Sequence, residues 1–278
     1  WLRNKKVELE DPSFVADFLN APKRFGWCGE EFVTARDGVY TDRTKSEQVI
    51  KFQSISTASN RRGNMTADVG LMVFDEFMPE DRRYPKKAHT MLLSLTKTVL
   101  SGNRDAKCYC LSNFISAANP YFVGFRIYPD KKKDITYYPD KLLAIEVCRG
   151  YRCAIEDDNP WNKVYAAGGY KDYASAEEDS LFMLISRVPR DVELLPYFIK
   201  SNGLIYAAGY KNGLLYWHEY RGPTKWVFAA NLQETSDKVS LIPRWFRKEI
   251  KLWSEDNIMR FATPNVMYAI LSVIYDAV

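Results

Sequence analysis

Two adjacent acids, Asp75 and Glu76, directly follow the apolar run 70–74. A run of that length, bounded by polar residues, predicts a buried β-strand rather than a helix. A carboxylate at the end of such a strand can bind Mg²⁺, which prefers carboxylate oxygens and retained waters, and a second carboxylate can position a water for attack on a phosphoryl group. This arrangement is the Walker B pattern. A strand that simply ends in an acidic loop has the same sequence, so the pair alone leaves both interpretations open.

A second strand end lies at Ser112-Asn113, after the apolar run 108–111. Residues 89–100, between the two runs, place four apolar side chains at helical spacing: Met91, Leu92, Leu95 and Val99. Strand, helix and strand in this order predict a right-handed parallel crossover. Asp75 and Asn113 are therefore expected at the carboxyl ends of neighbouring strands, which is the edge where α/β sheets bind ligands.

The loop that would grip nucleotide phosphates is absent from these 278 residues. A P-loop needs glycines ahead of a Lys-Ser or Lys-Thr pair, because its backbone N–H groups surround the phosphate oxygens. Lys45-Ser46 lacks the glycines, and Gly168-Gly169-Tyr170-Lys171 lacks the hydroxyl residue and the spacing. Trp1-Leu2-Arg3 resembles the end of a strand already under way, so we expect the chain to be cut at its start, with the P-loop upstream. The alternative is a chain that is not an NTPase.

Composition is that of an ordinary globular protein, with 46% hydrophobic and 27% charged residues, and the length allows two domains. A net charge of +4 is too small to indicate a nucleic-acid partner. No apolar run is long enough for a membrane span and no signal peptide opens the chain, so a cytosolic protein without membrane contact is expected. The five scattered cysteines and two histidines disfavour zinc, Ser-His-Asp and Cys-His sites. Buried reduced thiols are expected instead.

The pattern along the chain predicts three parts. Residues 1–149 alternate short apolar runs with helical stretches, as α/β domains with mostly parallel strands do, and 142–147 is predicted as a further strand. Residues 150–188 are weakly periodic and are expected to form a linker subdomain. Residues 189–278 are expected to form an α+β domain, in which two Asn-Gly pairs mark hairpins and helices follow near the end.

Three ordered motifs with matching gaps look like those of the encapsidation ATPases of phi-29-type podophages. They are Val73-Phe74-Asp75-Glu76-Phe77, Cys108-Tyr109-Cys110-Leu111-Ser112-Asn113 and Asn119-Pro120-Tyr121-Phe122. The similarity continues through Asn202-Gly203 and Gly213-Leu214-Leu215-Tyr216 to the C-terminal helices, so it covers nearly the whole chain. The resemblance implies an ASCE (RecA-like) P-loop NTPase core, incomplete at its N-terminus, followed by a small α+β RNase H-like domain without nuclease acids that faces nucleic acid or the portal.

The function that this resemblance implies is ATP-driven translocation of double-stranded viral DNA into a procapsid. The motor would be a homo-oligomeric ring, a pentamer, acting in the host cytoplasm and transiently on the portal (connector) of the procapsid. Its best-known members use a packaging RNA, and ATP and Mg²⁺ are the expected ligands. The alternative, if the P-loop is genuinely absent, is a non-hydrolysing nucleic-acid-binding or structural ring subunit.

The resemblance also implies roles for single residues. Asp75 would bind Mg²⁺, Glu76 would activate the attacking water, and Asn113 would act as the polar sensor of the γ-phosphate. Arg104 lies near where the family places its arginine finger, although the family's position aligns with Ser101 unless one residue is inserted. Arg61 and Arg62 lie about where the family carries another basic residue that acts across the subunit interface. The alternatives are a turn residue for Asn113 and solvated surface side chains for the arginines.

The last part of the chain raises the question of nuclease activity. Larger packaging motors carry there an RNase H-like nuclease built from several acids around two metals. Residues 197–217 contain no Asp or Glu, so no nuclease activity is expected. Four basic residues interleaved with aromatics are expected to face nucleic acid or a neighbouring subunit: Arg244, Arg247, Lys248 and Lys251. The alternative is a helix with its aromatics in the core and its charges in water.

Overall fold

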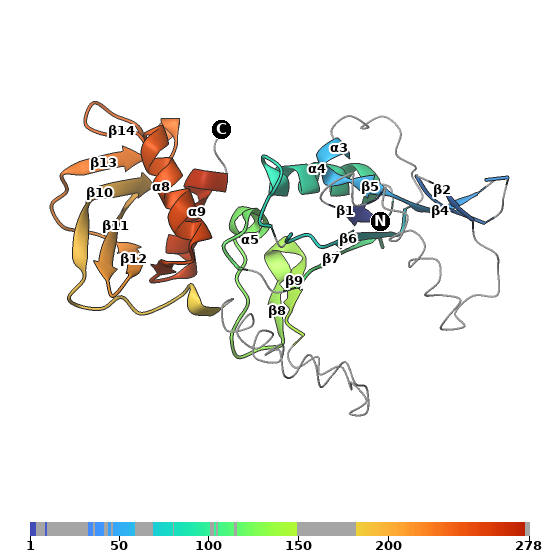
Figure 1. Cartoon of the computed structure of the whole chain (residues 1–278), viewed down its shortest axis with the longest axis horizontal. Coiled ribbons are helices and arrows are strands. Elements are labelled where there is room, and N and C mark those ends of the chain that lie inside the picture. The colour runs from blue at the N-terminus through green and yellow to red at the C-terminus, as the bar shows by residue number, and fades with distance from the viewer. Residues whose placement is uncertain are drawn as a thin grey trace. The chain divides into compact units, whose positions relative to one another are not determined.

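The computed structural model describes residues 1–3, 9, 33–35, 37–41, 44–45, 47–58, 69–79, 81–100, 103, 105–113, 116–148 and 182–275. The chain divides into two compact units, Trp1–Asn113 and Phe114–Val278. Each unit has its own sheet, as the labelled strands in Figure 1 show.

The first unit is built on a four-stranded parallel sheet in the order β5-β1-β6-β7. Its strands are β1 (Leu2–Arg3), β5 (Gln53–Ser54), β6 (Leu71–Asp75) and β7 (Lys107–Leu111). Helix α4 (Ala88–Leu100) connects β6 to β7, and Asp75 lies in register with Leu111. The predicted strand–helix–strand crossover is therefore confirmed, and the carboxyl ends of β6 and β7 meet at one edge.

The core of this unit lies between α4 and the sheet. The helix buries Ala88, Leu92, Leu95 and Val99, which agrees with the predicted helical spacing at three of those positions. Phe74 of β6 and Ile55 of the short helix α3 (Ile55–Ala58) are fully buried. A separate antiparallel sheet consists of β2 (Val33–Ala35), β3 (Gly38–Tyr40) and β4 (Gln48–Lys51).

Strand β7 is unusually exposed, since all five of its residues are accessible to solvent. Among the described residues, no strand pairs with its outer edge. The thiols of Cys108 and Cys110 lie on one face of it, 4.0 Å apart, and their contact lowers the pKa of Cys108 and raises that of Cys110. These two cysteines and Cys148 are exposed, so the prediction of buried thiols is wrong for all three. Cys28 and Cys153 lie outside the described residues.

The second unit contains a six-stranded sheet in the order β14-β13-β10-β11-β12-β15. Strands β10 (Glu193–Ser201), β11 (Leu204–Lys211) and β12 (Leu214–Glu219) form an antiparallel meander. Three parallel additions flank it: β13 (Trp226–Ala229), β14 (Ser240–Leu241) and β15 (Met259–Phe261). Both predicted Asn-Gly turns are confirmed. Residues 202, 203, 212 and 213 all have positive φ, as type I′ hairpin turns require.

Two helices pack on one face of this sheet, α8 (Arg244–Glu255) and α9 (Pro264–Tyr275), and η3 (Leu232–Glu234) lies between β13 and β14. Trp217 and Ile199 of the sheet, Phe246 of α8 and Ile270 of α9 are almost completely buried. Burial of this apolar surface is the main stabilising term for the unit. In the described part of the chain, no helix is both long and apolar enough to cross a membrane.

Residues 116–148 belong to the second unit, although the sequence suggested an α/β domain running to 149. They form α5 (Pro120–Phe125), β8 (Ile135–Tyr138), η2 (Pro139–Lys141) and β9 (Leu143–Glu146). The hydroxyl of Tyr275 in α9 donates to the carbonyl of Ala118 at 2.8 Å, beside α5. The strand predicted at 142–147 is present as β9, and among the described strands it pairs with β8 alone, because the turn at η2 folds it back into a hairpin. Most of the linker predicted at 150–188 lies outside the described residues and stays a prediction.

Asn119 explains why α5 begins where it does. Its buried side chain accepts hydrogen bonds from the N–H groups of Tyr121 and Phe122, at 3.0 and 2.9 Å, and donates to the carbonyl of Ser116 at 2.9 Å. We expect Asn119→Ala to lower the free energy of unfolding by about 1–2 kcal/mol, measured by urea denaturation, because two buried donors lose their acceptor. Asn119→Ser keeps a capping oxygen and should recover part of the loss. Equal stability of the alanine variant and the wild type would refute this capping role.

Candidate active site

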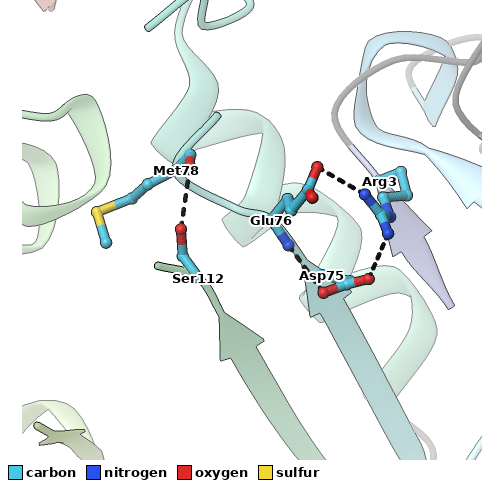
Figure 2. A network of polar contacts seen from close by, with 5 residues as sticks. All are labelled: Arg3, Asp75, Glu76, Met78 and Ser112. Carbon is cyan, nitrogen blue, oxygen red and sulfur yellow. Dashed lines mark hydrogen bonds and ion pairs between the residues drawn. The ribbon is translucent and has the colours of Figure 1, made fainter. Parts of the chain in front are cut away.

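Asp75 and Glu76 lie at the carboxyl end of β6, between the ends of β1 and β7. Successive side chains of a strand point to opposite faces, so adjacent acids normally diverge. Glu76 breaks this alternation with a left-handed backbone, φ 49°, which is an uncommon conformation for a residue other than glycine. Both carboxylates therefore reach the same partner (Figure 2).

That partner is Arg3, the last residue of β1. Its Nη2 lies 2.7 Å from Oδ2 of Asp75, and its Nη1 lies 2.6 Å from Oε2 of Glu76. The other Asp75 oxygen, Oδ1, accepts a hydrogen bond from the backbone N–H of Glu76 at 3.1 Å. The Arg3 side chain is only 14% exposed, whereas that of Glu76 is 54% exposed. The guanidinium thus bridges two acids from a rigid position with charge-assisted hydrogen bonds.

The charges of this cluster suit a divalent cation. Two carboxylates and one guanidinium leave a net charge of −1 at an accessible sheet edge, and Asp75 already binds one cationic group. Within the described ranges, no group of three or more His, Cys, Asp or Glu side chains is arranged for a metal. A cation held by one or two carboxylates, with waters and phosphate oxygens as its other ligands, is the usual mode for Mg²⁺. The residues present therefore fit Mg²⁺ together with a phosphorylated ligand.

The loop after Glu76 is tied to the end of β7. The hydroxyl of Ser112 donates to the carbonyl of Met78 at 3.0 Å (Figure 2). The N–H of Phe77 donates to the carbonyl of Leu111 at 3.1 Å. Asn113, the next residue after Ser112, is exposed and forms no hydrogen bond with another described residue. The fold therefore brings Asn113 to the same sheet edge as the two acids, as predicted, with its amide accessible to a ligand.

Arg104 and Arg62 lie outside the described residues, so their predicted roles are not tested. Asn103 and Asp105 lie in the turn before β7, whose first residue, Lys107, donates its N–H to the carbonyl of Gly70 at 3.1 Å. This turn is at the amino ends of β6 and β7, the edge opposite the acids. A five-residue strand separates the two edges by about 15 Å.

Arg3 is the site residue that sequence reasoning missed. Trp1-Leu2-Arg3 was recognisable as a strand, but its neighbours in the sheet were not. The sequence held one indication of its role: Arg3 ends one predicted strand of the parallel domain, and acids end another. The pairing of Leu2 with Phe74, one residue before Asp75, brings these two strand ends into contact.

The sequence profile of the podovirus DNA encapsidation protein (Gp16) family matches residues 1–254. The chain belongs to this family. The DNA packaging proteins of Bacillus phages phi29 and PZA are each 36% identical to it over 93 residues, which are 33% of this chain and 28% of theirs. That of Bacillus phage B103 is 34% identical over 93 residues, 33% of this chain and 29% of its own. The matched stretch is thus under a third of these relatives' length.

Two solved structures share the fold of this encapsidation-family chain. The phi-28 gp11 DNA packaging motor aligns with a TM-score of 0.64 at 15% identity, over 100% of this chain and 86% of that one. The bacteriophage phi-29 viral genome packaging motor assembly aligns with a TM-score of 0.60 at 20% identity, over 98% and 85%. At these identities the likeness shows the fold alone, a mixed α/β architecture with a parallel sheet.

The basic helix of this encapsidation-family chain is α8. Arg244, Lys248 and Lys251 are exposed on it, and Lys251 contacts Glu255 at 3.6 Å. Arg247 is half-buried, and its Nε is enclosed without a hydrogen bond to another described residue. Of the aromatics between them, Phe246 is buried but Trp245 is 50% exposed. The interpretation that the aromatics are all core is therefore wrong for Trp245.

Proposed function

We propose that this chain is the body of a ring motor that uses ATP to translocate double-stranded viral DNA into a procapsid. The observation that carries the proposal is the Asp75-Glu76 pair at the carboxyl end of β6, in a chain of a DNA encapsidation family. Phosphoryl transfer requires chiefly charge neutralisation and a positioned nucleophile, and adjacent acids at a parallel sheet edge serve both needs. The proposal includes an ASCE, RecA-like assignment for the first unit.

Three side chains at the carboxyl ends of β6 and β7 would carry out the reaction. Asp75 is the carboxylate ligand for Mg²⁺, which when bound neutralises charge on the phosphate oxygens. Glu76 orients the attacking water and accepts its proton, a role that its accessible side chain permits. Asn113 donates or accepts a hydrogen bond at the γ-phosphate or the water. Each side chain comes from the end of β6 or β7, so the sheet itself sets their spacing.

Arg3 competes with a metal for Asp75 in this mechanism. Each oxygen of Asp75 accepts one hydrogen bond, from Arg3 and from the N–H of Glu76, and keeps a second lone pair for a metal. Since the same guanidinium also holds Glu76, we infer that a metal on Asp75 weakens the Arg3 bridge, so Arg3 links ligand binding to the position of Glu76.

The phosphate-binding P-loop is the part of the proposed site for which these 278 residues contain no motif. If the protein hydrolyses ATP, a P-loop must come from other residues. The strand that leads into such a P-loop could add to the exposed outer edge of β7. A further parallel strand there would lie beside Asn113 at the same carboxyl edge. A helix after that strand would direct its N-terminal N–H groups at the phosphates.

The proposal assigns the remaining partners as well. As the family resemblance implies, Arg104 would serve a neighbouring subunit of a homopentameric ring, and Arg62 would act across the same interface. The ring would work in the host cytoplasm on the portal of the procapsid, with packaging RNA as a further partner.

A rival function is that of a non-hydrolysing ring or nucleic-acid-binding subunit, which the lack of a P-loop among the 278 residues favours. The experiment that separates the two is a measurement of ATP hydrolysis by the complete gene product, with procapsids and duplex DNA present. Turnover that requires Asp75 supports the motor. A complete product that neither binds nor hydrolyses ATP, yet is required for packaging, would support the rival.

The second unit is proposed to be an RNase H-like domain that has lost nuclease chemistry. Its meander of three antiparallel strands, extended by two parallel strands on the β10 side, supports that fold. Strands β10, β11 and β12 carry only two acids, Glu193 at one end and Glu219 at the other. A two-metal nuclease needs several converging carboxylates.

We therefore expect no nicking of supercoiled plasmid by the purified protein with Mn²⁺ present, followed on agarose gels. Glu219→Gln is the matched variant, because Glu219 is the acid adjoining Arg221 and the end of β12. Nicking by the wild type that disappeared in Glu219→Gln would overturn the prediction. Nicking that persisted in this variant would indicate a contaminating nuclease.

A further inference from the structure

Two half-exposed tryptophans flank one tyrosine in the second unit. Trp245, at the start of α8, contacts the ring of Tyr197 edge-on, with ring centroids 5.4 Å apart. Trp226, at the start of β13, is the register partner of Tyr197 on the neighbouring strand. The exposed fractions of Trp226 and Trp245 are 56% and 50%. We call Trp226, Tyr197 and Trp245 the aromatic edge.

The aromatic edge packs against two further aromatic rings. Phe228 stacks on Tyr197 with ring centroids 6.2 Å apart and meets Trp245 at 90°. Phe246, which is buried, contacts Trp245 at 5.3 Å between centroids. Trp245 therefore rests on packed rings while half of its surface faces solvent. Exposed tryptophan held in place by packed rings is typical of binding surfaces.

Positive charge surrounds the aromatic edge. Lys225 adjoins Trp226, Arg244 adjoins Trp245, and Lys248 lies one helical turn after Arg244 on α8. All three are exposed, and none forms an ion pair with another described residue. Accessible aromatic faces among exposed cations suit a ligand that combines flat rings with negative charge. Nucleic acids with unpaired bases have this combination, because bases stack on aromatic side chains while cations neutralise phosphates.

We propose that the aromatic edge binds unpaired bases of a nucleic acid by stacking on Trp245 and Trp226, with Lys225, Arg244 and Lys248 on the adjoining phosphates. This inference rests on the proposed role of the protein in packaging DNA and on the expectation from the sequence that the basic residues of α8 face nucleic acid, and it specifies the kind of strand. Duplex DNA offers only its phosphates to such a surface, because its bases are already stacked in the helix. The cations therefore contact either form, whereas the tryptophans discriminate in favour of the single strand.

The test is fluorescence anisotropy of the full chain with labelled 20-nucleotide oligothymidylate, oligouridylate and a duplex of the same length. Trp245→Ala and Trp226→Ala are each expected to weaken single-strand binding by about 5- to 150-fold and to leave duplex binding unchanged. The slope of log affinity against log salt should stay constant in these variants. Lys248→Ala should instead reduce that slope by about 0.7 on single strands. The DNA and RNA probes show which strand chemistry is preferred.

Trp245→Phe retains a smaller stacking face and should recover part of the affinity, which separates stacking from misfolding. Leu232→Ala, at a position 70% exposed in η3, is the matched apolar control and should change nothing. Wild-type single-strand affinity in both tryptophan-to-alanine variants would overturn the inference, as would equal losses for duplex and single strand. If the wild type binds only the duplex, the stacking inference is wrong but α8 can still contact nucleic acid. If the wild type binds none of the probes, the expected nucleic-acid contact of α8 is wrong as well. Ring assembly lost with nucleic-acid affinity intact would show a protein interface instead.

Discussion

Glu76→Gln is expected to abolish ATP turnover by the complete packaging protein while leaving ATP binding intact. Glutamine has nearly the same shape and keeps an oxygen that can accept the hydrogen bond from Arg3. It cannot accept a proton from water, and loss of a general base typically slows a reaction by about 10²- to 10⁴-fold. The measurements are steady-state phosphate release and equilibrium binding of a fluorescent ATP analogue.

Asp140→Asn is the matched control for this variant, because it removes an exposed acid in η2 of the second unit, outside the candidate site. Its turnover should equal that of the wild type. Hydrolysis at the wild-type rate by Glu76→Gln would remove Glu76 from the mechanism and with it the proposed site. Loss of ATP binding together with turnover would show that residue 76 maintains the structure of the edge rather than the chemistry.

Arg3→Ala is expected to have two opposite effects. It leaves the carboxylates of Asp75 and Glu76 adjacent and without their guanidinium, so the free energy of unfolding of the first unit should fall by about 2–3 kcal/mol. It also removes the cation that competes for Asp75, so Mg²⁺ should bind more tightly and raise the thermal midpoint more than in the wild type. Urea denaturation and thermal melts with and without Mg²⁺ measure the two effects.

Lys97→Ala on α4 removes the same charge at a site without an ion pair to a described residue and should leave both quantities unchanged. Arg3→Lys replaces the planar guanidinium with a single ammonium group, which cannot bridge two carboxylates in the same way. Its stability and its Mg²⁺ affinity should both lie between those of the wild type and Arg3→Ala. A loss of stability without tighter Mg²⁺ binding would mean that Arg3 only supports the fold. Unchanged stability would mean that its two ion pairs contribute nothing measurable.

The parts of the fold that could be predicted from sequence were those with local patterns. The run ending at Asp75, the helical spacing of α4 and the two Asn-Gly turns each depend on a few consecutive residues, and each has the predicted form. The placement of β9 could not be predicted in this way. A short apolar strand looks the same in a sheet or in a hairpin, and only its pairing with β8 decides the matter. Likewise, 116–148 joins the second unit through tertiary contacts that leave no periodic pattern.

The candidate site shows the same division. Asp75, Glu76 and Asn113 follow their own strands directly, so parallel topology was enough to place them at one edge. Arg3 is more than seventy residues away in the chain, and its contact depends on β1 lying beside β6. Trp245 has the spacing of a core aromatic, and only the packing of Phe246 beneath it leaves it half-exposed.

The exposure of β7 has a practical consequence for the purified chain. An edge strand with free N–H and C=O groups is a template for pairing with other chains, and proteins normally protect such edges with charge, proline or a covering element. β7 has one lysine, Lys107, at its start, while Tyr109 and Leu111 are 51% and 47% exposed further along. Concentrated solutions of these 278 residues by themselves should therefore self-associate through β7, and a peptide strand that pairs with it should keep them monomeric.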